Sequence, residues 1–460
     1  VLVKSGISFV SIEGAQKNLE KDIPGWDFDA TVQQARQLWN KAVSGVHVEG
    51  GTEDQKQIFY TALYNTMIDP RCTSDVDGSY LGADGKSHQT AEFQYRTIFS
   101  GWDVFRSQFP LQTIINPAVV NDEVNSLIQL AELSGRGYYP RWEILNAYSG
   151  CMLGNPAVSV VLDAYTKGIR TYDVQKAYLF CRNSVDKFGN QPLGYVAGDV
   201  SRTLEYAYTD WCVGRFAELL GKAADSKEYY RRSLDYKHIY NPAIEWFQAR
   251  KADGSWESWQ GKTVHGQSCT ESNPYQQGWF VPHDVYGLME LLGKETYIRE
   301  LTAFFEKAPA KFTWNDYYNH ANEPVHQVAF MFHYAGLPWL TQKWSRIVCE
   351  QAYGTGVDGL CGNEDVGQMS AWYVLASSGL HPVCPGDGEY MLTSPLFERV
   401  TFTLDGRYAK GKTFTIIAKN NSDKNRYIQS VQLNGKPLGR LWIRHRSEER
   451  RVGKECRSRW

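Results

Sequence analysis

Apolar residues recur at helical spacing over most of the chain up to about residue 383. The sequence at 52–55, Thr-Glu-Asp-Gln, forms a capping box ahead of one such helix. Further amphipathic stretches, which indicate helices, cover residues 121–134, 203–221, 226–236, 286–307, 326–335, 340–352 and 368–379. Gly-, Pro-, Asn- and Trp-rich connections separate these stretches. We therefore expect paired helices closed into a toroid, since no short repeat supports an open solenoid.

The hydrophobic period changes from helical to alternating at about residue 384. Alternation predicts strands at residues 400–404, 413–417 and 427–433, and the following Asn434-Gly435 is a strong hairpin signal. A small C-terminal β module is therefore expected. At the other end, alternating apolar positions within residues 1–10 predict the exit of a strand.

The last residues, 446–460, are rich in basic side chains and have no apolar period. They are interpreted as a non-native tail that resembles translated adapter sequence, with a solvated basic tail as the alternative. In that case, strands that belong after His445 are missing. The chain begins with Val1 and has neither an initiating Met nor a signal peptide, so we expect that sequence has been lost upstream and that a localisation signal cannot be read.

Composition narrows the classes of function. The 460 residues carry a net charge of −2, which argues against nucleic-acid and membrane-surface binding. No apolar run reaches the length of about twenty residues that a membrane-spanning helix needs. The nine cysteines form no CxxC pair, which argues against a structural zinc site. Aromatic residues make up 14% of the chain and suit a sugar-binding protein, although most are expected in the core. The oligomeric state is left open.

The acid-rich turn at residues 358–367 is the strongest candidate for chemistry. It presents Asn363, Glu364 and Asp365 directly ahead of an apolar helix. A carboxylate at a helix entrance either caps free N–H groups or presents an acid to a ligand, and both uses stay open on this segment alone.

Two further segments place polar groups among aromatic residues. Asp103 and Arg106, beside Trp102, lie three residues apart and form either a surface ion pair or part of a less exposed site. Glu271 lies in a polar turn close to many rings, where a carboxyl with a raised pKa could act as a general acid. Alone, Glu271 is a weak signal.

A fourth segment, residues 320–326, joins a loop to a helix. Pro324 fits the first turn of that helix and puts Glu323 at its N-terminus, between Asn322 and His326. Carboxylate and carbonyl oxygens there suit a hard cation such as calcium, while simple capping is an equal alternative. Two carboxylates from distant loops, one protonated and one ionised, are what hydrolysis of a glycosidic bond requires.

In this order, the segments resemble glycoside hydrolase family 92, the calcium-dependent exo-α-mannosidases common in gut Bacteroidetes. The resemblance covers residues 1–445 and is carried by residues 6–11, 102–106, 165–169, 203–208, 279–284, 322–324 and the run GNEDVGQMSAWY at 362–373. It implies an N-terminal β-sandwich followed by an (α/α)6 barrel. The corresponding divisions are 1–15 (sandwich remnant), 16–50 (linker), 51–383 (barrel), 384–445 (β segment) and 446–460 (tail).

The resemblance also implies roles for single residues. Glu271 would protonate the leaving oxygen, and Asp365, helped by Asn363, would activate water in an inverting reaction. Ca²⁺ would bind near Glu323 and Asp365. The groups implied to bind substrate are Trp102, Asp103, Arg106, Asn322, Glu323 and His326. The substrate would be terminal α-linked mannose, most often α-1,2, on N-glycans or mannans, and the full-length parent would be periplasmic, cell-surface or secreted.

This chain departs from the family pattern at Asn155, at residues 274–277, and at Asn363, where some members carry Asp. Because the missing sandwich contributes to the pocket in this family, we expect residues 1–460 alone to be inactive or poorly soluble. One alternative is a non-catalytic, carbohydrate-binding helical toroid. Another is a different (α/α)6 hydrolase or lyase, which would need no metal site near Glu323.

Overall fold

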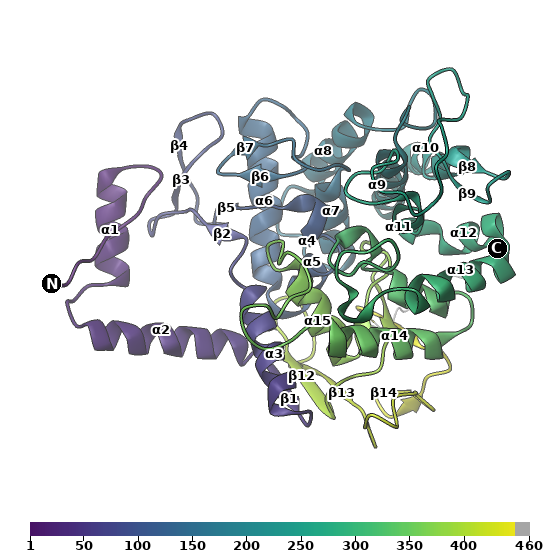
Figure 1. The fold of residues 1–460 in the computed structure, drawn as a ribbon. Helices are drawn as coiled ribbons and strands as arrows, with labels where there is room; N and C mark the ends of the chain where they lie inside the picture. Colours follow the sequence, from purple (N-terminus) through teal and green to yellow (C-terminus); the bar gives the residue numbers. More distant parts are fainter. Residues whose placement is uncertain (447–460) are drawn as a thin grey trace.

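Buried and half-exposed helices alternate along the chain in a computed structural model, which describes residues 1–446 (Figure 1). The buried helices are α5 (Gln108–Ile115), α7 (Pro156–Thr166), α9 (Val200–Leu219), α11 (Pro274–Gln277), η4 (Glu323–Val325) with η5 (Val328–His333), and α15 (Gln368–Ser378). Their half-exposed partners are α6 (Pro117–Leu133), α8 (Val174–Lys187), α10 (Ala223–Arg232), α12 (Val285–Leu292) with α13 (Lys294–Glu306), α14 (Pro338–Gln351) and α3 (Glu53–Asn65).

The buried helices form a closed inner ring. Each contacts the next, from α15 to α5, α7, α9, α11 and η4. The indole Nε1 of Trp372 on α15 donates to the carbonyl of His326 at 2.8 Å, which joins the last inner helix to η4. The half-exposed helices cover this ring from outside, and α3 closes the outer layer against α15. The predicted (α/α)6 toroid is confirmed.

The degree of burial explains which helices the apolar periodicity of the sequence predicted and which it missed. Outer helices carry one apolar face, and α6, α10, α12 to α14 lie where periodicity placed them. The inner helices α5 and α7 are buried on nearly every side, so their sequences have no polar face to mark a period. The region predicted at 326–335 is a 3₁₀ helix. Helix α8 is amphipathic and capped by Asp173, a signal that was available and missed.

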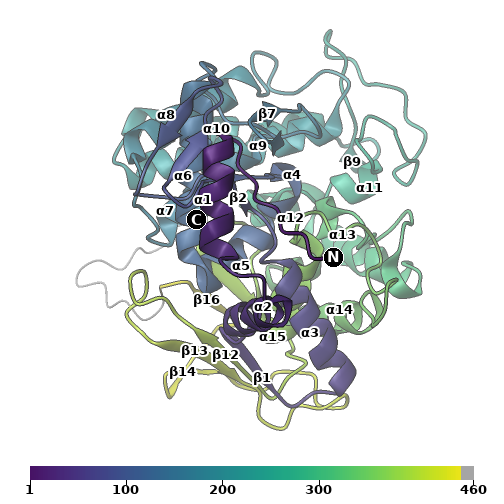
Figure 2. The ribbon, with the colours of Figure 1, turned by 90° about the vertical axis from the view of Figure 1, so that its left-hand side faces the viewer.

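The C-terminal sheet recruits a strand from the other end of the chain. Strand β12 (Arg399–Thr403) pairs with β13 (Thr413–Ile417) as predicted, and on its other side with β1 (Val46–Glu49). The three strands lie together under the toroid in both views (Figures 1 and 2). The segment predicted as a linker at 16–50 therefore ends in a strand of this sheet.

The predicted hairpin at Asn434-Gly435 is confirmed, since it joins β14 (Gln432–Leu433) to β15 (Lys436–Pro437) with positive φ at both turn residues. The strand expected over 427–433 is only two residues long. The other short elements are β2 (Arg71–Cys72), β3 (Ser79–Leu81), β4 (Ser87–Gln89), β5 (Arg96–Thr97), α4 (Gly101–Val104), β6 (Glu143–Ile144), β7 (Ala147–Tyr148), η1 (Asp235–Ile239), β8 (Tyr240–Asn241), β9 (Trp246–Phe247), η2 (Pro282–Asp284), η3 (Ala310–Phe312), β10 (Leu380–His381), β11 (Glu389–Leu392) and β16 (Trp442–Arg444).

The first residues differ from expectation. Residues 1–11 contain no strand, so the predicted strand exit is wrong, and helices α1 (Ile12–Asp22) and α2 (Phe28–Val43) follow. Both helices stand apart from the toroid, and α2 reaches it near α3 (Figure 1), where Trp39 packs on Tyr64 with ring centroids 4.4 Å apart. The assignment of residues 1–15 to a sandwich remnant stays a prediction. Of the segment interpreted as a non-native tail, residues 447–460 lie outside the described residues.

We expect strand β1 to be a stabilising part of the sheet and not a passive linker. Val46 is fully buried and His47, its neighbour, is exposed. Val46→Ala should therefore lower the free energy of unfolding by about 2 kcal/mol, because it leaves a cavity, whereas His47→Ala should change it little. Thermal unfolding of the two variants measures the difference. Equal melting temperatures would contradict the role of β1.

Candidate active site

Three acidic residues lie at or just before the amino-terminal ends of different inner helices. Asp103 lies in α4, just before α5; Glu323 begins η4; and Asp365 precedes α15. Because the inner helices run parallel in a toroid of this kind, the segments that precede them meet at one end of the ring. Carboxylates are also favoured there, since the helix dipoles point their positive ends to that side.

These three carboxylates crowd together. Oxygen atoms of Asp103, Glu323 and Asp365 lie within 4.8 Å of one another. Burial, and then the charge of Asp365, raises the pKa of Asp103 to about 7. Burial, and then the charges of Asp103 and Asp365, raises the pKa of Glu323 well above its usual range. The buried Oε1 of Glu323 has no hydrogen-bond partner among the described residues. The carboxylates therefore repel one another, and the nearby guanidinium of Arg106 offsets only part of that repulsion.

Glu364 and Asp365 are neighbours in the acid-rich turn, but their side chains have different surroundings. The Glu364 carboxylate accepts hydrogen bonds from the Ser370 hydroxyl at 2.7 Å and from the Ser370 backbone N–H at 3.3 Å, and so caps α15. Asp365 faces the carboxylate cluster instead. Its φ is +47°, and Val366 follows with +59°, backbone conformations that L-residues rarely adopt. Glu364 therefore fulfils the capping role, while the presentation of an acid to a ligand stays a prediction for Asp365.

Of the two alternatives for Asp103 and Arg106, the surface ion pair is wrong and the less exposed site is confirmed, because both side chains are buried and Arg106 pairs with Glu205. Arg106 Nη2 lies 3.2 Å from Glu205 Oε1. Asp103 instead accepts a hydrogen bond from the Ser100 hydroxyl, which in turn accepts one from the Trp142 indole. Burial raises the pKa of Glu205, and the guanidinium of Arg106 opposes that rise.

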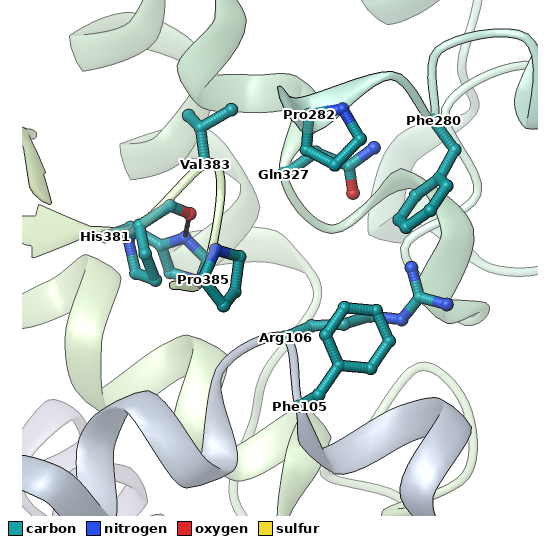
Figure 3. A pocket seen from close by; sticks show the side chains of 9 residues that line it. Phe105, Arg106, Phe280, Pro282, Gln327, His381, Val383 and Pro385 are labelled. Atoms are coloured by element: carbon teal, nitrogen blue, oxygen red, sulfur yellow. Dashed lines mark hydrogen bonds between the residues drawn. The ribbon is translucent and has the colours of Figure 1, made fainter. Parts of the chain in front are cut away.

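Arg106 is enclosed by aromatic rings. Its guanidinium carbon lies 4.6 Å from the ring centroid of Phe105 and 4.8 Å from that of Phe280. Figure 3 shows the guanidinium pointing toward Phe280, at the edge of a small cavity that these residues line. Trp102 donates from Nε1 to Glu205 Oε1 at 3.1 Å. Trp102, Arg106 and Glu205 therefore form one buried unit beside the cluster.

Glu205 is the site residue that the sequence analysis failed to assign. It lies within the motif at 203–208 that carried part of the resemblance. In α9 its neighbours Leu204, Ala207 and Tyr208 are fully buried. A buried acid on such an apolar helical face needs a polar partner. That requirement could have identified Glu205 as a candidate site residue from the sequence.

Glu271 lies at the exposed edge of the site. It has a positive φ of +50°, and the Asn322 amide donates to its backbone carbonyl at 2.9 Å, which ties the Glu271 turn to η4. Partial burial, and then the charge of Asp365, raises the pKa of the Glu271 carboxyl. Asn363 is also exposed, two residues before Asp365.

His326 occupies a different environment from the other candidates. It is fully buried, with Nε2 at 3.1 Å from the carbonyl of His320 and Nδ1 at 3.0 Å from Nε2 of Gln368. Burial lowers its pKa to about 3. Both ring nitrogens of His326 are therefore engaged with His320 and Gln368. Neither is left to hydrogen-bond a sugar.

Known proteins match this chain over nearly its full length. The profile described as glycosyl hydrolase family 92 catalytic domain matches residues 14–456. A family GH92 α-mannosidase from Bacteroides thetaiotaomicron superposes with a TM-score of 0.89 at 31% identity, over 95% of this chain and 59% of that one. A family GH92 inverting mannosidase from strain VPI-5482 of the same species gives 0.87 at 34% identity, over 95% and 64%.

A curated relative from Arthroderma benhamiae, named an uncharacterized secreted glycosidase, is 27% identical over 97% of this chain and 59% of its own length. The chain thus spans about three fifths of the length of these relatives. Since the family profile matches almost all of it and the fold agrees, the chain belongs to glycosyl hydrolase family 92.

Proposed function

We propose that the protein removes terminal α-linked mannose, most often α-1,2-linked, from N-glycans or mannans by a calcium-dependent inverting mechanism. The observation that carries the proposal is the convergence of Asp103, Glu323 and Asp365 within 4.8 Å, with Glu271 close enough for Asp365 to raise its pKa. The names of two structural relatives, an α-mannosidase and an inverting mannosidase, support the substrate and the stereochemistry.

Glu271 is the general acid in this proposal and Asp365 the general base. The raised pKa keeps a proton on Glu271 for the leaving oxygen. The effect of Asp365 on the pKa of Glu271 is electrostatic, and no hydrogen bond between the two carboxyls contributes to it. A gap between the two carboxyls is what an inverting pair needs, because the attacking water must fit on the opposite face of the sugar. Asn363, in the same turn, is the proposed helper of Asp365.

The carboxylate cluster fits a calcium ion. All its ligand atoms are oxygens, and the unpartnered Oε1 of Glu323 is a buried acceptor in need of a cation. Glu323 and Asp365, as proposed from the sequence, would hold the ion, and Asp103 adds a third carboxylate. When bound, Ca²⁺ would neutralise the cluster and attract the hydroxyl groups of the sugar.

The surroundings favour a blind pocket for one terminal sugar. Arg106, paired with Glu205 and packed between Phe105 and Phe280, fills the toroid beside the cluster. Trp102, Asp103, Arg106, Asn322 and Glu323 are the proposed substrate-binding groups, and His326 supports them from behind. We propose that this filled interior stops a glycan chain from passing through the toroid, which would limit the enzyme to chain ends.

The competing hypothesis is a carbohydrate-binding toroid without catalysis. It would be favoured if Glu271 and Asp365 lay on separate surfaces. Their electrostatic coupling, next to Glu323, supports the enzyme.

We further propose a periplasmic, cell-surface or secreted location, since the curated relative is named secreted. None of the described helices combines the length and hydropathy that crossing a bilayer requires.

Glu271→Gln should abolish most hydrolysis of α-1,2-mannobiose, with a loss of about 100-fold or more in kcat/KM, because the leaving oxygen loses its proton donor. Dinitrophenyl α-mannoside should lose much less, since its leaving group needs no proton. Both rates are measured on residues 1–460 and on any longer form of the chain that its gene encodes. Full activity of the variant on mannobiose would remove Glu271 as the acid.

The same carboxyl predicts the alkaline limb of the pH profile. The pKa of Glu271 is raised, so the active protonated form persists to higher pH than for an ordinary Glu, and kcat/KM should fall as pH rises through that pKa. The limb should be absent in Glu271→Gln. A limb that persists unchanged in the variant would assign it to another group.

Glu323→Gln tests the cation site. Calcium should raise the melting temperature of the wild type and chelation should lower it, because ligand binding stabilises the folded state. In Glu323→Gln the response should be lost, while the melting temperature in chelator should equal or exceed that of the wild type, since one repelling carboxylate is gone. Glu364→Gln is the matched control, because Glu364 faces Ser370 and should leave the calcium response intact. Wild-type stability and activity indifferent to chelation would contradict the calcium role.

A further inference from the structure

The first residue of α15, Gln368, makes four hydrogen bonds that join three parts of the inner ring. Its side chain is fully buried. The amide oxygen Oε1 accepts from the backbone N–H of Ser107 at 2.9 Å and from that of Gln108 at 3.1 Å. The amide nitrogen Nε2 donates to the Ser107 hydroxyl and to His326 Nδ1, both at 3.0 Å. All four hydrogen-bonding positions of this amide are thereby used.

The bonds to Ser107 and Gln108 cap one inner helix from another. Helix α5 begins at Gln108, and the side chain of Ser107 makes no capping bond to it. The first N–H groups of a helix have no partner within that helix, and here they are buried. The Gln368 carbonyl supplies the partner from α15, which fixes the start of α5, and with it the preceding Asp103 segment, against the start of α15.

The bond to His326 extends the same link to η4. Because Nε2 of His326 is 3.1 Å from a carbonyl oxygen, it carries the proton, and Nδ1 is free to accept from Gln368. Burial lowers the pKa of His326 to about 3, so this tautomer stays neutral. His326 lies three residues after Glu323, at the end of η4.

Gln368 is also tied directly to the third acid. Its backbone N–H donates to the Asp365 carbonyl at 3.1 Å, which closes the turn with positive φ at Asp365 and Val366. Through its side chain and its backbone N–H, this one residue connects the three segments that carry Asp103, Glu323 and Asp365. Those segments are separated by more than 250 residues along the sequence from Asp103 to Asp365.

We propose that Gln368 is the positioning residue that holds the three carboxylates in register. It touches neither the proposed sugar nor the proposed cation. It acts by fixing the start of α5, the end of η4 and the start of α15 relative to one another, so that their acids meet at one point against mutual repulsion. The catalytic consequence rests on the proposed function, whereas the geometric consequence does not.

The test compares Gln368→Met with Gln342→Met. Met keeps the side-chain length and removes all four hydrogen bonds. Gln342 is also a buried glutamine, but it lies on outer helix α14, where its Oε1 accepts from the Ile428 N–H at 2.9 Å. Both variants should lose stability. Only Gln368→Met should lose about 100-fold in kcat/KM, the scale of loss that a misplacement of about 1 Å can cause.

A crystal structure of Gln368→Met supplies a readout that does not depend on activity. We expect Asp365 to move out of the group in which the three carboxylates lie within 4.8 Å. An unchanged group, or a rate loss no greater than that of Gln342→Met, would overturn the proposal. If the wild type fails to hydrolyse mannosides even in the longest form that its gene encodes, the proposed function fails and the crystallographic comparison still decides on Gln368.

Gln368→Glu covers the case in which the Met variant does not fold. Buried next to other acids, the new carboxyl should take up a proton and keep one acceptor and one donor. It should therefore retain the cap on α5 and lose less in kcat/KM than the Met variant. A Glu variant with the full wild-type rate and a displaced Asp365 would contradict the link between position and rate.

Discussion

The crowding of three carboxylates at one end of the toroid is the constraint on which the rest of the site depends. The charge of Asp365 contributes to the raised pKa values of Asp103 and Glu323, and the three side chains would separate if their segments were free to move. They stay together because each precedes or begins a different inner helix, and the inner ring is closed. The toroid thus converts three loop positions, distant in sequence, into one rigid charged site.

Hydrogen bonds and one buried ion pair support this charged site. Glu364 caps α15 and leaves Asp365 turned toward the cluster. Gln368 joins the starts of α5 and α15 to the end of η4, and the Arg106–Glu205 pair fixes Trp102. Within residues 1–446, no group donates a hydrogen bond to Oε1 of Glu323. Positive φ at Glu271 and Asp365 adds local backbone strain where both proposed catalytic carboxyls are presented, and such strain persists only when surrounding structure enforces it.

Sequence reasoning succeeded where a residue's role is local. Amphipathic outer helices, the Thr52 capping box and the Asn434-Gly435 hairpin are encoded within a few residues, and all three are present. It failed where the partner is distant. The buried inner helices α5 and α7 show no helical period, β1 becomes a strand only by pairing with β12, and the Arg106–Glu205 pair bridges residues far apart in the chain. Family resemblance identified the acids, whereas their mutual distances required the fold.

Formation of the site and closure of the ring are therefore one event. An inner helix such as α15 is buried on every residue, so it gains little stability outside the ring and exposes apolar surface if it leaves. Because each carboxylate is attached to such a helix, partial opening would separate the acids before the outer layer unfolds. Repulsion within the cluster favours that opening, and burial of the inner helices opposes it. A bound cation would act on the same balance, which links the proposed calcium site to the stability of the ring and not only to the sugar.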